Sequence, residues 1–344
     1  MNSEVGRDKN LLRQSINMAP TKVELELTEQ CNLSCVFCYN SQKPIISGLS
    51  ERILQRLIEE GVLEIVLTGG EPMLHPKFSE ILKFCTDNFV RVMIQTNGTL
   101  ISKEWARLFS RLGVFGINIS LHGLEDVHEG LTQVNGSFQK ALDGIRNVIY
   151  ADKNIRLASN CVLTKKNFKF VNEQVDFLYD VGVREFTFTR FTPTGVGESS
   201  RTLLLSRDEL NETLEFLVQK FKSLENAKFI LANSMPMCGL KKNLEFLCEC
   251  CNFGISKFYV NVQGDVLLCG MSRLVIGNIL QQTFRDMKSS TAIYKNRVLG
   301  LDLPNECRQC LNFQKCRGGC RAAAVAYFGR LNAPDPYATM ASLY

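Results

Sequence analysis

The chain has 344 residues, of which 45% are hydrophobic and 22% charged, and its formal net charge is +5. This length favours two domains, and no apolar run approaches the ~18 residues of a transmembrane helix, which excludes a membrane protein. Scattered lysines and arginines indicate a solvated surface, and they exclude a nucleic-acid partner. The first 20 residues lack the apolar core of a signal peptide, so we expect a cytoplasmic protein.

Short β-like runs alternate with helical patterns from Lys22 onwards. Strands are predicted at 22–27, 63–68, 90–96, 114–121, 155–164 and 183–191, and helices at 50–61, 78–88, 102–113, 137–150, 167–182 and 206–224. Ser50 and Ser206 are predicted N-caps. Six such α/β units indicate a parallel sheet with helices outside it, as an open six-unit barrel or a doubly wound sheet. In both architectures, ligands bind at the C-terminal ends of the strands.

The pattern changes beyond about residue 230, where long helices become scarce. A hairpin is predicted at 257–270, with its turn at residues 263–265. We therefore expect an N-terminal tail at 1–20, an α/β domain at 21–228 and a second domain at 229–344. Because the second domain is rich in cysteine, metal clusters could supply much of its order.

The 14 cysteines are unevenly distributed. In a reducing compartment, so many thiols favour metal or redox chemistry over disulfides. Cys85 and Cys161 are isolated in apolar surroundings, and we expect them to be buried as small hydrophobic side chains. Three cysteines follow the first strand directly, at positions 31, 35 and 38, and nine fall between 238 and 320.

Cys31-x3-Cys35-x2-Cys38 offers three thiolates within one loop. A structural zinc site requires four ligands, whereas a 4Fe–4S cluster with three thiolates keeps one iron open for a further ligand. The spacing favours the cluster and leaves zinc as the alternative. Polar or glycine-containing segments recur at the strand ends, at 68–72, 95–98, 119–123 and 189–195, where a ligand cleft is expected.

This trio, with aromatic Phe37 before its last cysteine, and the GGEP segment at 69–72 resemble the motifs of radical S-adenosylmethionine (radical SAM) enzymes over about residues 20–225. The resemblance implies a partial (β/α)6 TIM-like barrel. It also implies that the open iron of the cluster is chelated by the methionyl amino and carboxylate groups. An electron from the cluster then cleaves S-adenosylmethionine, and the resulting 5′-deoxyadenosyl radical abstracts hydrogen from a substrate.

Site roles follow from the same resemblance. Cys31, Cys35 and Cys38 would ligate the cluster. The implied contacts to S-adenosylmethionine are Phe37 at the adenine, Gly69, Gly70 and Glu71 at the methionyl amino group, and Asn97, Ser120 and Arg190 at the ribose or carboxylate. Arg190 equally suits an ion pair, and the sequence assigns no catalytic acid or base.

The second cysteine set is Cys307-x2-Cys310-x5-Cys316-x3-Cys320, preceded by Cys251-x12-Gly264-x4-Cys269. A zinc ribbon is the alternative, but the spacing resembles the SPASM extension of radical SAM enzymes over about residues 238–338, which implies up to two auxiliary 4Fe–4S clusters. The first would be held by Cys251, Cys269 and Cys320. Its fourth ligand would be Cys238 or Cys248, with Cys250 as the less favoured candidate. The second would be held by Cys307, Cys310 and Cys316.

The sequence departs from this family at the end of the second set. A further cysteine is expected after Cys320, and Ala338 stands in its place. The second auxiliary cluster would then have an open iron, take a carboxylate ligand such as Asp335, or be incomplete or absent.

The resemblance implies a radical SAM oxidoreductase, with peptide or protein maturation by crosslinking or side-chain oxidation as the favoured function. Modification or decarboxylation of a tetrapyrrole or other small molecule is the alternative, with Arg190, Lys165 and Lys166 as candidate anchors. A non-catalytic metal-binding scaffold is a third hypothesis. A reductant such as flavodoxin or ferredoxin is an expected partner. Because about 20 residues precede the first strand, we expect a peptide maturase to use a separate leader-recognition protein or a substrate that binds without one.

Overall fold

The computed structural model describes residues 11–40, 51–152 and 154–339. Its strands are β1 (Lys22–Thr28), β2 (Glu64–Gly69), β3 (Arg91–Thr96), β4 (Gly116–Ser120), β5 (Arg156–Leu163), β6 (Glu185–Arg190), β7 (Lys228–Leu231), β8 (Lys257–Val260), β9 (Asp265–Leu267) and β10 (Val275–Asn278). They form one sheet in the order β10-β9-β8-β1-β2-β3-β4-β5-β6-β7. Strands β1 to β7 are parallel, and β8 pairs in parallel with β1.

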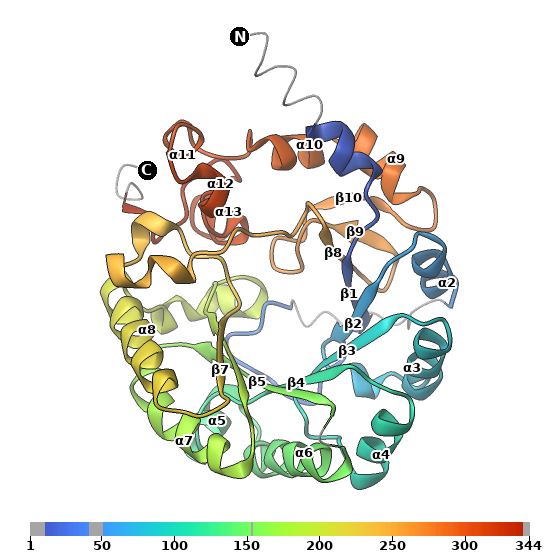
Figure 1. Cartoon of the computed structure of the whole chain (residues 1–344), viewed down its shortest axis with the longest axis vertical. Helices are drawn as coiled ribbons and strands as arrows, with labels where there is room; N and C mark the ends of the chain where they lie inside the picture. Colours follow the sequence, from blue (N-terminus) through green and yellow to red (C-terminus); the bar gives the residue numbers. More distant parts are fainter. Residues whose placement is uncertain (1–10, 41–50, 153, 340–344) are drawn as a thin grey trace.

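Helices α2 to α8 cover the outside of this sheet (Figure 1). They are α2 (Glu51–Glu59), α3 (Phe78–Asp87), α4 (Lys103–Arg111), α5 (Glu125–Thr132), α6 (Ser137–Ala151), α7 (Val171–Val181) and α8 (Arg207–Lys222). The C-terminal part contains α9 (Phe284–Ser290), α10 (Ala292–Leu299), α11 (Asn305–Arg308), α12 (Phe313–Cys316) and α13 (Arg321–Phe328). The 3-10 turns are η1 (Pro72–Leu74), η2 (Phe168–Phe170), η3 (Gly195–Leu203), η4 (Met237–Gly239) and η5 (Lys242–Leu247).

The expected α/β barrel architecture is confirmed, with helices α2 to α8 arranged around the parallel strands (Figure 1). Ser206 caps α8 in a reciprocal arrangement with Glu209, whereas Ser50 lies outside the described residues. The hairpin β8–β9 turns at Gly264, whose φ of +85° suits glycine. Helix α5 and strand β7 were not predicted from the sequence. Every helix within the described ranges is too short or too polar to cross a membrane.

Alternation along the strands separates an apolar outer face from a polar interior. On β4, Ile117 and Ile119 are buried in the hydrophobic core, whereas Asn118 and Ser120 line an interior cavity. Successive side chains of a strand point to opposite faces, so each strand supplies both layers. Full burial of one branched aliphatic side chain contributes ~1.5–3 kcal/mol, and these outer faces therefore hold the helices on the sheet.

The expected domain boundary between 228 and 229 falls within β7. This strand pairs in parallel with β6, and β8 pairs with β1 at the other side of the barrel sheet. Residues of the C-terminal part thus continue the sheet of the N-terminal part. We propose a boundary after Leu231, which keeps β7 whole.

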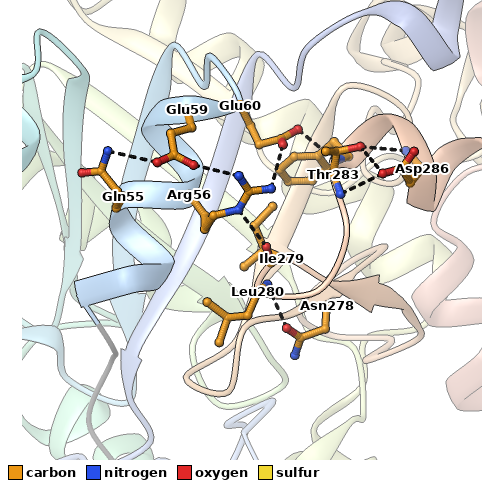
Figure 2. Close-up of polar contacts among 10 residues, drawn as sticks. Gln55, Arg56, Glu59, Glu60, Asn278, Ile279, Leu280, Thr283 and Asp286 are labelled. Atoms are coloured by element: carbon orange, nitrogen blue, oxygen red, sulfur yellow. Dashed lines mark hydrogen bonds and ion pairs between the residues drawn. The ribbon is translucent and has the colours of Figure 1, made fainter.

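The C-terminal part docks on the first helix of the barrel through Arg56. Its Nε donates to the carbonyl oxygen of Ile279 at 3.3 Å, and its Nη1 contacts Glu59 at 2.7 Å (Figure 2). The neighbouring Glu60 accepts the backbone N–H of Phe284 at 2.9 Å. These bonds fix the connection between β10 and α9 beside α2.

A buried ion pair joins β6 to the C-terminal segment. Arg190 donates from Nη1 to Asp335 Oδ1 at 2.9 Å and from Nη2 to Oδ2, and the two side chains are 1% and 0% exposed. The same carboxylate accepts the backbone N–H groups of Cys320 at 2.8 Å and Tyr337 at 3.0 Å. One carboxylate therefore fixes three segments that are distant in sequence.

Replacing Asp335 with alanine should lower the free energy of unfolding by about 3–5 kcal/mol, because Arg190 would keep a buried charge without its partner. Anaerobic urea denaturation followed by circular dichroism measures the loss. The matched control is Asp87→Ala, whose exposed pair with Lys83 contributes ~0.3–0.5 kcal/mol. Equal losses in the two variants would contradict the prediction.

Candidate functional site

A cavity of about 500 Å³ lies inside the barrel at the C-terminal ends of the strands. Its wall includes the ends of β2 to β6 and the loops that follow them, among them Gly69, Asn97, Ser120 and Arg190. This is the position expected for a ligand site in a parallel α/β sheet. The cysteine loop after β1 closes one side of the cavity.

All three cysteines of this loop, Cys31, Cys35 and Cys38, line the cavity. The loop is held by helix α5, because the N–H groups of Ser34 and Val36 donate to the last carbonyls of that helix, both at 3.0 Å. Burial raises the pKa of all three thiols. Without a metal centre the thiols therefore keep their protons, and binding of a cationic metal centre would displace them.

Gly69 and Gly70 allow the ends of β1 and β2 to approach each other closely. The N–H of Gly70 donates to the carbonyl of Thr28 at 2.7 Å. A Cβ on Gly69 would overlap the same carbonyl oxygen, and a Cβ on Gly70 would overlap that of Gln30. Both positions border the cavity, so side chains there would displace the backbone of the wall.

Glu71 supports this wall from within the core. Its carboxylate accepts bonds from the Thr96 hydroxyl at 2.7 Å, the Asn97 N–H at 2.8 Å and the Met73 N–H at 3.1 Å. Burial raises its pKa to about 7, and the hydrogen bonds oppose that shift. Glu71 therefore fixes the ends of β2 and β3 relative to each other, which agrees with a role exerted through the backbone.

The other predicted contacts also lie on the cavity wall. The Asn97 side chain donates to Asn32 at 2.8 Å and approaches the sulfur of Cys31 at 3.9 Å. Phe37 packs edge-on against His122, with ring centroids 4.6 Å apart. Arg190 reaches the wall, but its guanidinium is engaged by Asp335. Arg190 thus forms an ion pair, which was one of the two roles that the sequence suggested for it.

Sequence reasoning missed a set of buried polar atoms that face the cavity without a hydrogen-bond partner. Lining residues with such atoms are Glu29, Asn40, Asn118, His128, Arg190, Thr192, Asn233 and Arg321. A buried unpaired polar group costs ~1–3 kcal/mol, so these atoms indicate contact points for a ligand. Strand alternation could have identified Asn118, which precedes Ile119 on β4.

His128 has a defined hydrogen-bonding state in this wall. Its Nδ1 accepts the backbone N–H of His122 at 3.1 Å, and burial lowers its pKa to about 4. The ring is therefore neutral near pH 7, and its proton resides on Nε2. That Nε2–H is one of the unpartnered groups, so His128 can donate a hydrogen bond to a ligand in the cavity.

The C-terminal cysteines fall into two groups. Cys250, Cys251, Cys269 and Cys320 border the same cavity as the cysteine loop, and Cys269 and Cys320 belong to one apolar cluster with Met271. The second group gathers around Cys316 and comprises Cys238, Cys248, Cys307, Cys310 and Cys316. Asp335, a candidate ligand for the second cluster, already accepts hydrogen bonds at both oxygens.

The separation of these thiols is compatible with a metal cluster. Across residues 11–40, 51–152 and 154–339, no three His, Cys, Asp or Glu side chains are arranged to hold one metal ion. In a 4Fe–4S cluster each iron takes its own thiolate, so the ligands stand apart from one another. The three thiols at the cavity and the orphaned polar atoms beside them are consistent with a cluster and an additional polar ligand.

Two family models match the chain. Residues 25–166 match the radical SAM superfamily, and residues 250–311 match the iron–sulfur cluster-binding SPASM domain. The AdoMet-dependent heme synthase of Methanosarcina barkeri (strain Fusaro / DSM 804) is 26% identical, covering 93% of this chain and 96% of its own. The sporulation killing factor maturation protein SkfB of Bacillus subtilis (strain 168) is 26% identical over 87% of this chain and 69% of its own.

A solved structure shares the whole architecture. Streptococcus suis SuiB bound to precursor peptide SuiA superposes with a TM-score of 0.78 at 18% identity, covering 98% of this chain and 80% of that chain. A second structure of SuiB contains S-adenosylmethionine. At this level of identity the similarity establishes the fold.

The expectations of radical SAM chemistry, a SPASM domain, 4Fe–4S clusters and S-adenosylmethionine are confirmed by these matches. The roles of individual site residues and the number of clusters stay predictions, supported by the shared cavity. The chain belongs to the radical SAM superfamily and is an iron–sulfur enzyme with a C-terminal SPASM domain.

Proposed function

We propose that this enzyme matures a peptide or protein by oxidising a side chain or forming a crosslink. SkfB is a maturation protein, and SuiB has been solved with a precursor peptide. The observation that carries the proposal is the charge of the cavity. Its three arginines are each bonded to a carboxylate or to backbone carbonyls. Apart from one guanidinium Nε on each of Arg190 and Arg321, the unpartnered groups of the wall are neutral or acidic.

The arginines on the cavity wall have internal partners. Arg190 is paired with Asp335. Arg297 contacts Asp302 at 3.4 Å and donates to the backbone carbonyl of Cys251 at 2.8 Å. Their charges are therefore compensated within the protein and are poor anchors for a substrate carboxylate.

Arg321, the third arginine of the wall, donates to the backbone carbonyls of Leu331 at 2.9 Å and Ala333 at 2.6 Å. The candidate anchor Lys165 contacts Glu209 at 3.7 Å and is half-exposed. A substrate with several carboxylates requires free cations for its recognition. Lys257 lines the wall, but so do Glu24, Glu29 and Glu249. With the arginines engaged, this balance of charge disfavours a tetrapyrrole.

A peptide matches the remaining groups. The side-chain oxygens of Asn118 and Asn233, the hydroxyl of Thr192 and the Nε2–H of His128 are buried without partners. Amides, hydroxyls and neutral imidazole exchange hydrogen bonds with the uncharged N–H and C=O groups of a peptide backbone. The cavity is therefore suited to an extended segment that carries little charge.

Two sets of thiols border this cavity and define the proposed division of roles. Cys31, Cys35 and Cys38 would hold the cluster at which S-adenosylmethionine binds, and Cys251, Cys269 and Cys320 would hold an auxiliary cluster. When bound, the first cluster and S-adenosylmethionine supply a radical that abstracts hydrogen. Gly69 and Gly70 keep the wall beside the first set free of side chains. The hydrogen bonds of Glu71 fix the end of β2 relative to the end of β3 in that wall.

The partners in this proposal are a flavodoxin or ferredoxin as reductant and a separate leader-recognition protein. The number of cysteines, 14, suits a reducing compartment such as the cytoplasm. Decarboxylation or modification of a tetrapyrrole is the second candidate. It is favoured by the heme synthase of Methanosarcina barkeri, which aligns over 96% of its length.

An anaerobic reaction with S-adenosylmethionine, dithionite and candidate precursor peptides should yield methionine, 5′-deoxyadenosine and a peptide that is lighter by two hydrogens. Mass spectrometry detects all three products. Cys35→Ala should abolish cleavage because the cluster loses a ligand, whereas Cys85→Ala, a change in the apolar core, should retain it. Loss of carbon dioxide from a tetrapyrrole, with every peptide unchanged, would favour the second candidate.

Gly70→Ala should weaken binding of S-adenosylmethionine about 5- to 150-fold, because a Cβ there overlaps the Gln30 carbonyl and overpacking costs ~1–3 kcal/mol. Equilibrium dialysis with the cluster-loaded protein measures the dissociation constant. Gly130→Ala is the matched control, since an added Cβ in α5 meets no atom within 4 Å. Unchanged affinity in Gly70→Ala would remove this wall from the binding site.

A further inference from the structure

The second group of cysteines is organised around Cys316. The Cys316 sulfur accepts the backbone N–H of Met237 at 3.3 Å, and the Cys307 thiol lies within electrostatic range of Cys316, Cys238 and Cys310. The N–H of Asn312 donates to the sulfur of Cys310 at 3.4 Å. Backbone amides thus stabilise two of these sulfurs, as expected where thiolates accumulate negative charge.

Three segments meet at this group. A Cβ on Gly319 would lie 3.0 Å from Pro236 and 2.7 Å from Asp335, so the chain before Cys320 packs on both of the other segments. A Cβ on Gly239 would overlap the carbonyl oxygen of Tyr337. The turn η4, with Cys238 at its centre, therefore packs against the backbone of Tyr337, next to position 338.

Position 338 itself carries no ligand. Ala338 is buried, and its N–H donates to the carbonyl of Asp335 at 2.8 Å. The family pattern expects a cysteine here, and its alanine presents only a methyl group. Cys238 is exposed on the adjoining turn and brings a thiol to the same place from another part of the chain.

Cys248 also lies in this group, but its contacts differ. Its side chain is 2% exposed within the hydrophobic core, and its thiol donates to the carbonyl of Met235 at 3.4 Å. A buried thiol whose proton is already bonded to the backbone acts as a small core side chain. The thiol of Cys238 is exposed and therefore accessible to a cluster.

We propose that Cys238 is the fourth ligand of the second auxiliary cluster, together with Cys307, Cys310 and Cys316, and replaces the cysteine that is absent at position 338. This assignment differs from the sequence-based expectation, in which Cys238 or Cys248 belonged with Cys251, Cys269 and Cys320. The first set does not depend on Cys238, since Cys250 borders the cavity beside Cys251. The second cluster is then fully ligated by thiolates, with no open iron.

Iron and sulfide analysis of anaerobically reconstituted protein tests this assignment. Cys238→Ala leaves this cluster three thiolates and, unlike the cluster of the cysteine loop, no chelating ligand for its open iron. After desalting, it should therefore contain about four irons and four sulfides fewer per chain than the wild-type protein, and Cys85→Ala should match the wild type. The double variant Cys238→Ala/Ala338→Cys should recover the lost cluster, because a thiol returns at the adjoining position. Full iron content in Cys238→Ala, or loss of the cluster that Ala338→Cys fails to restore, would overturn the proposal.

A second measurement needs no variant and keeps the test independent of folding defects. In fully loaded wild-type protein, Cys238 should resist alkylation by iodoacetamide even though its side chain is exposed, because its sulfur is bound to iron. Removal of iron with a chelator should make it reactive, which peptide mass spectrometry detects. Labelling of Cys238 in the loaded protein would overturn the proposal, and this result is independent of the substrate that the enzyme modifies.

Discussion

The carboxylate of Asp335 is the constraint on which the arrangement of the two parts depends. It binds Arg190 at the end of β6 and the backbone N–H groups of Cys320 and Tyr337. A buried ion pair adds little net stability relative to an apolar replacement, because desolvation offsets the attraction of the charges. Its effect is positional, since neither charge tolerates a different neighbour. Strand β6, one cysteine of the cavity and the C-terminal segment are therefore held in fixed positions relative to one another.

Tyr337 extends this linkage back to the barrel. Its hydroxyl donates to the carbonyl of Leu205 at 2.8 Å, and its ring lies 4.9 Å from the Arg190 guanidinium carbon. The Tyr337 carbonyl oxygen packs against Gly239, where a Cβ would overlap it. The second cysteine group is thus positioned by the same contacts that close the cavity, which couples the ligand wall to a group of thiols that does not border it.

The features of this fold that depend on neighbouring residues could be predicted from the sequence. The alternation of strands β1 to β6, the Ser206 cap and the cysteine loop can each be recognised in a short stretch of sequence. Helix α5 was missed because its sequence is short and rich in polar residues, and β7 because it is a four-residue edge strand. The partner of Arg190 lies 145 residues away, and no periodicity identifies it. The sequence could not predict the grouping of Cys238 with Cys316 for the same reason, since the packing of three segments that are distant in sequence determines it.

The polar interior follows from the same alternation that builds the core, and it limits what the cavity can bind. Each inward position of a strand that is not apolar presents hydrogen-bonding groups, and several of these, including Asn118 and Thr192, have no partner within the protein. Unpaired groups of this kind destabilise the fold, so a ligand that bonds them stabilises the enzyme as it binds. Because the charge of Arg190 is compensated by Asp335, most of this bonding is directed to neutral groups. Discrimination among substrates therefore depends on where amide and hydroxyl groups lie along the wall, and less on net charge.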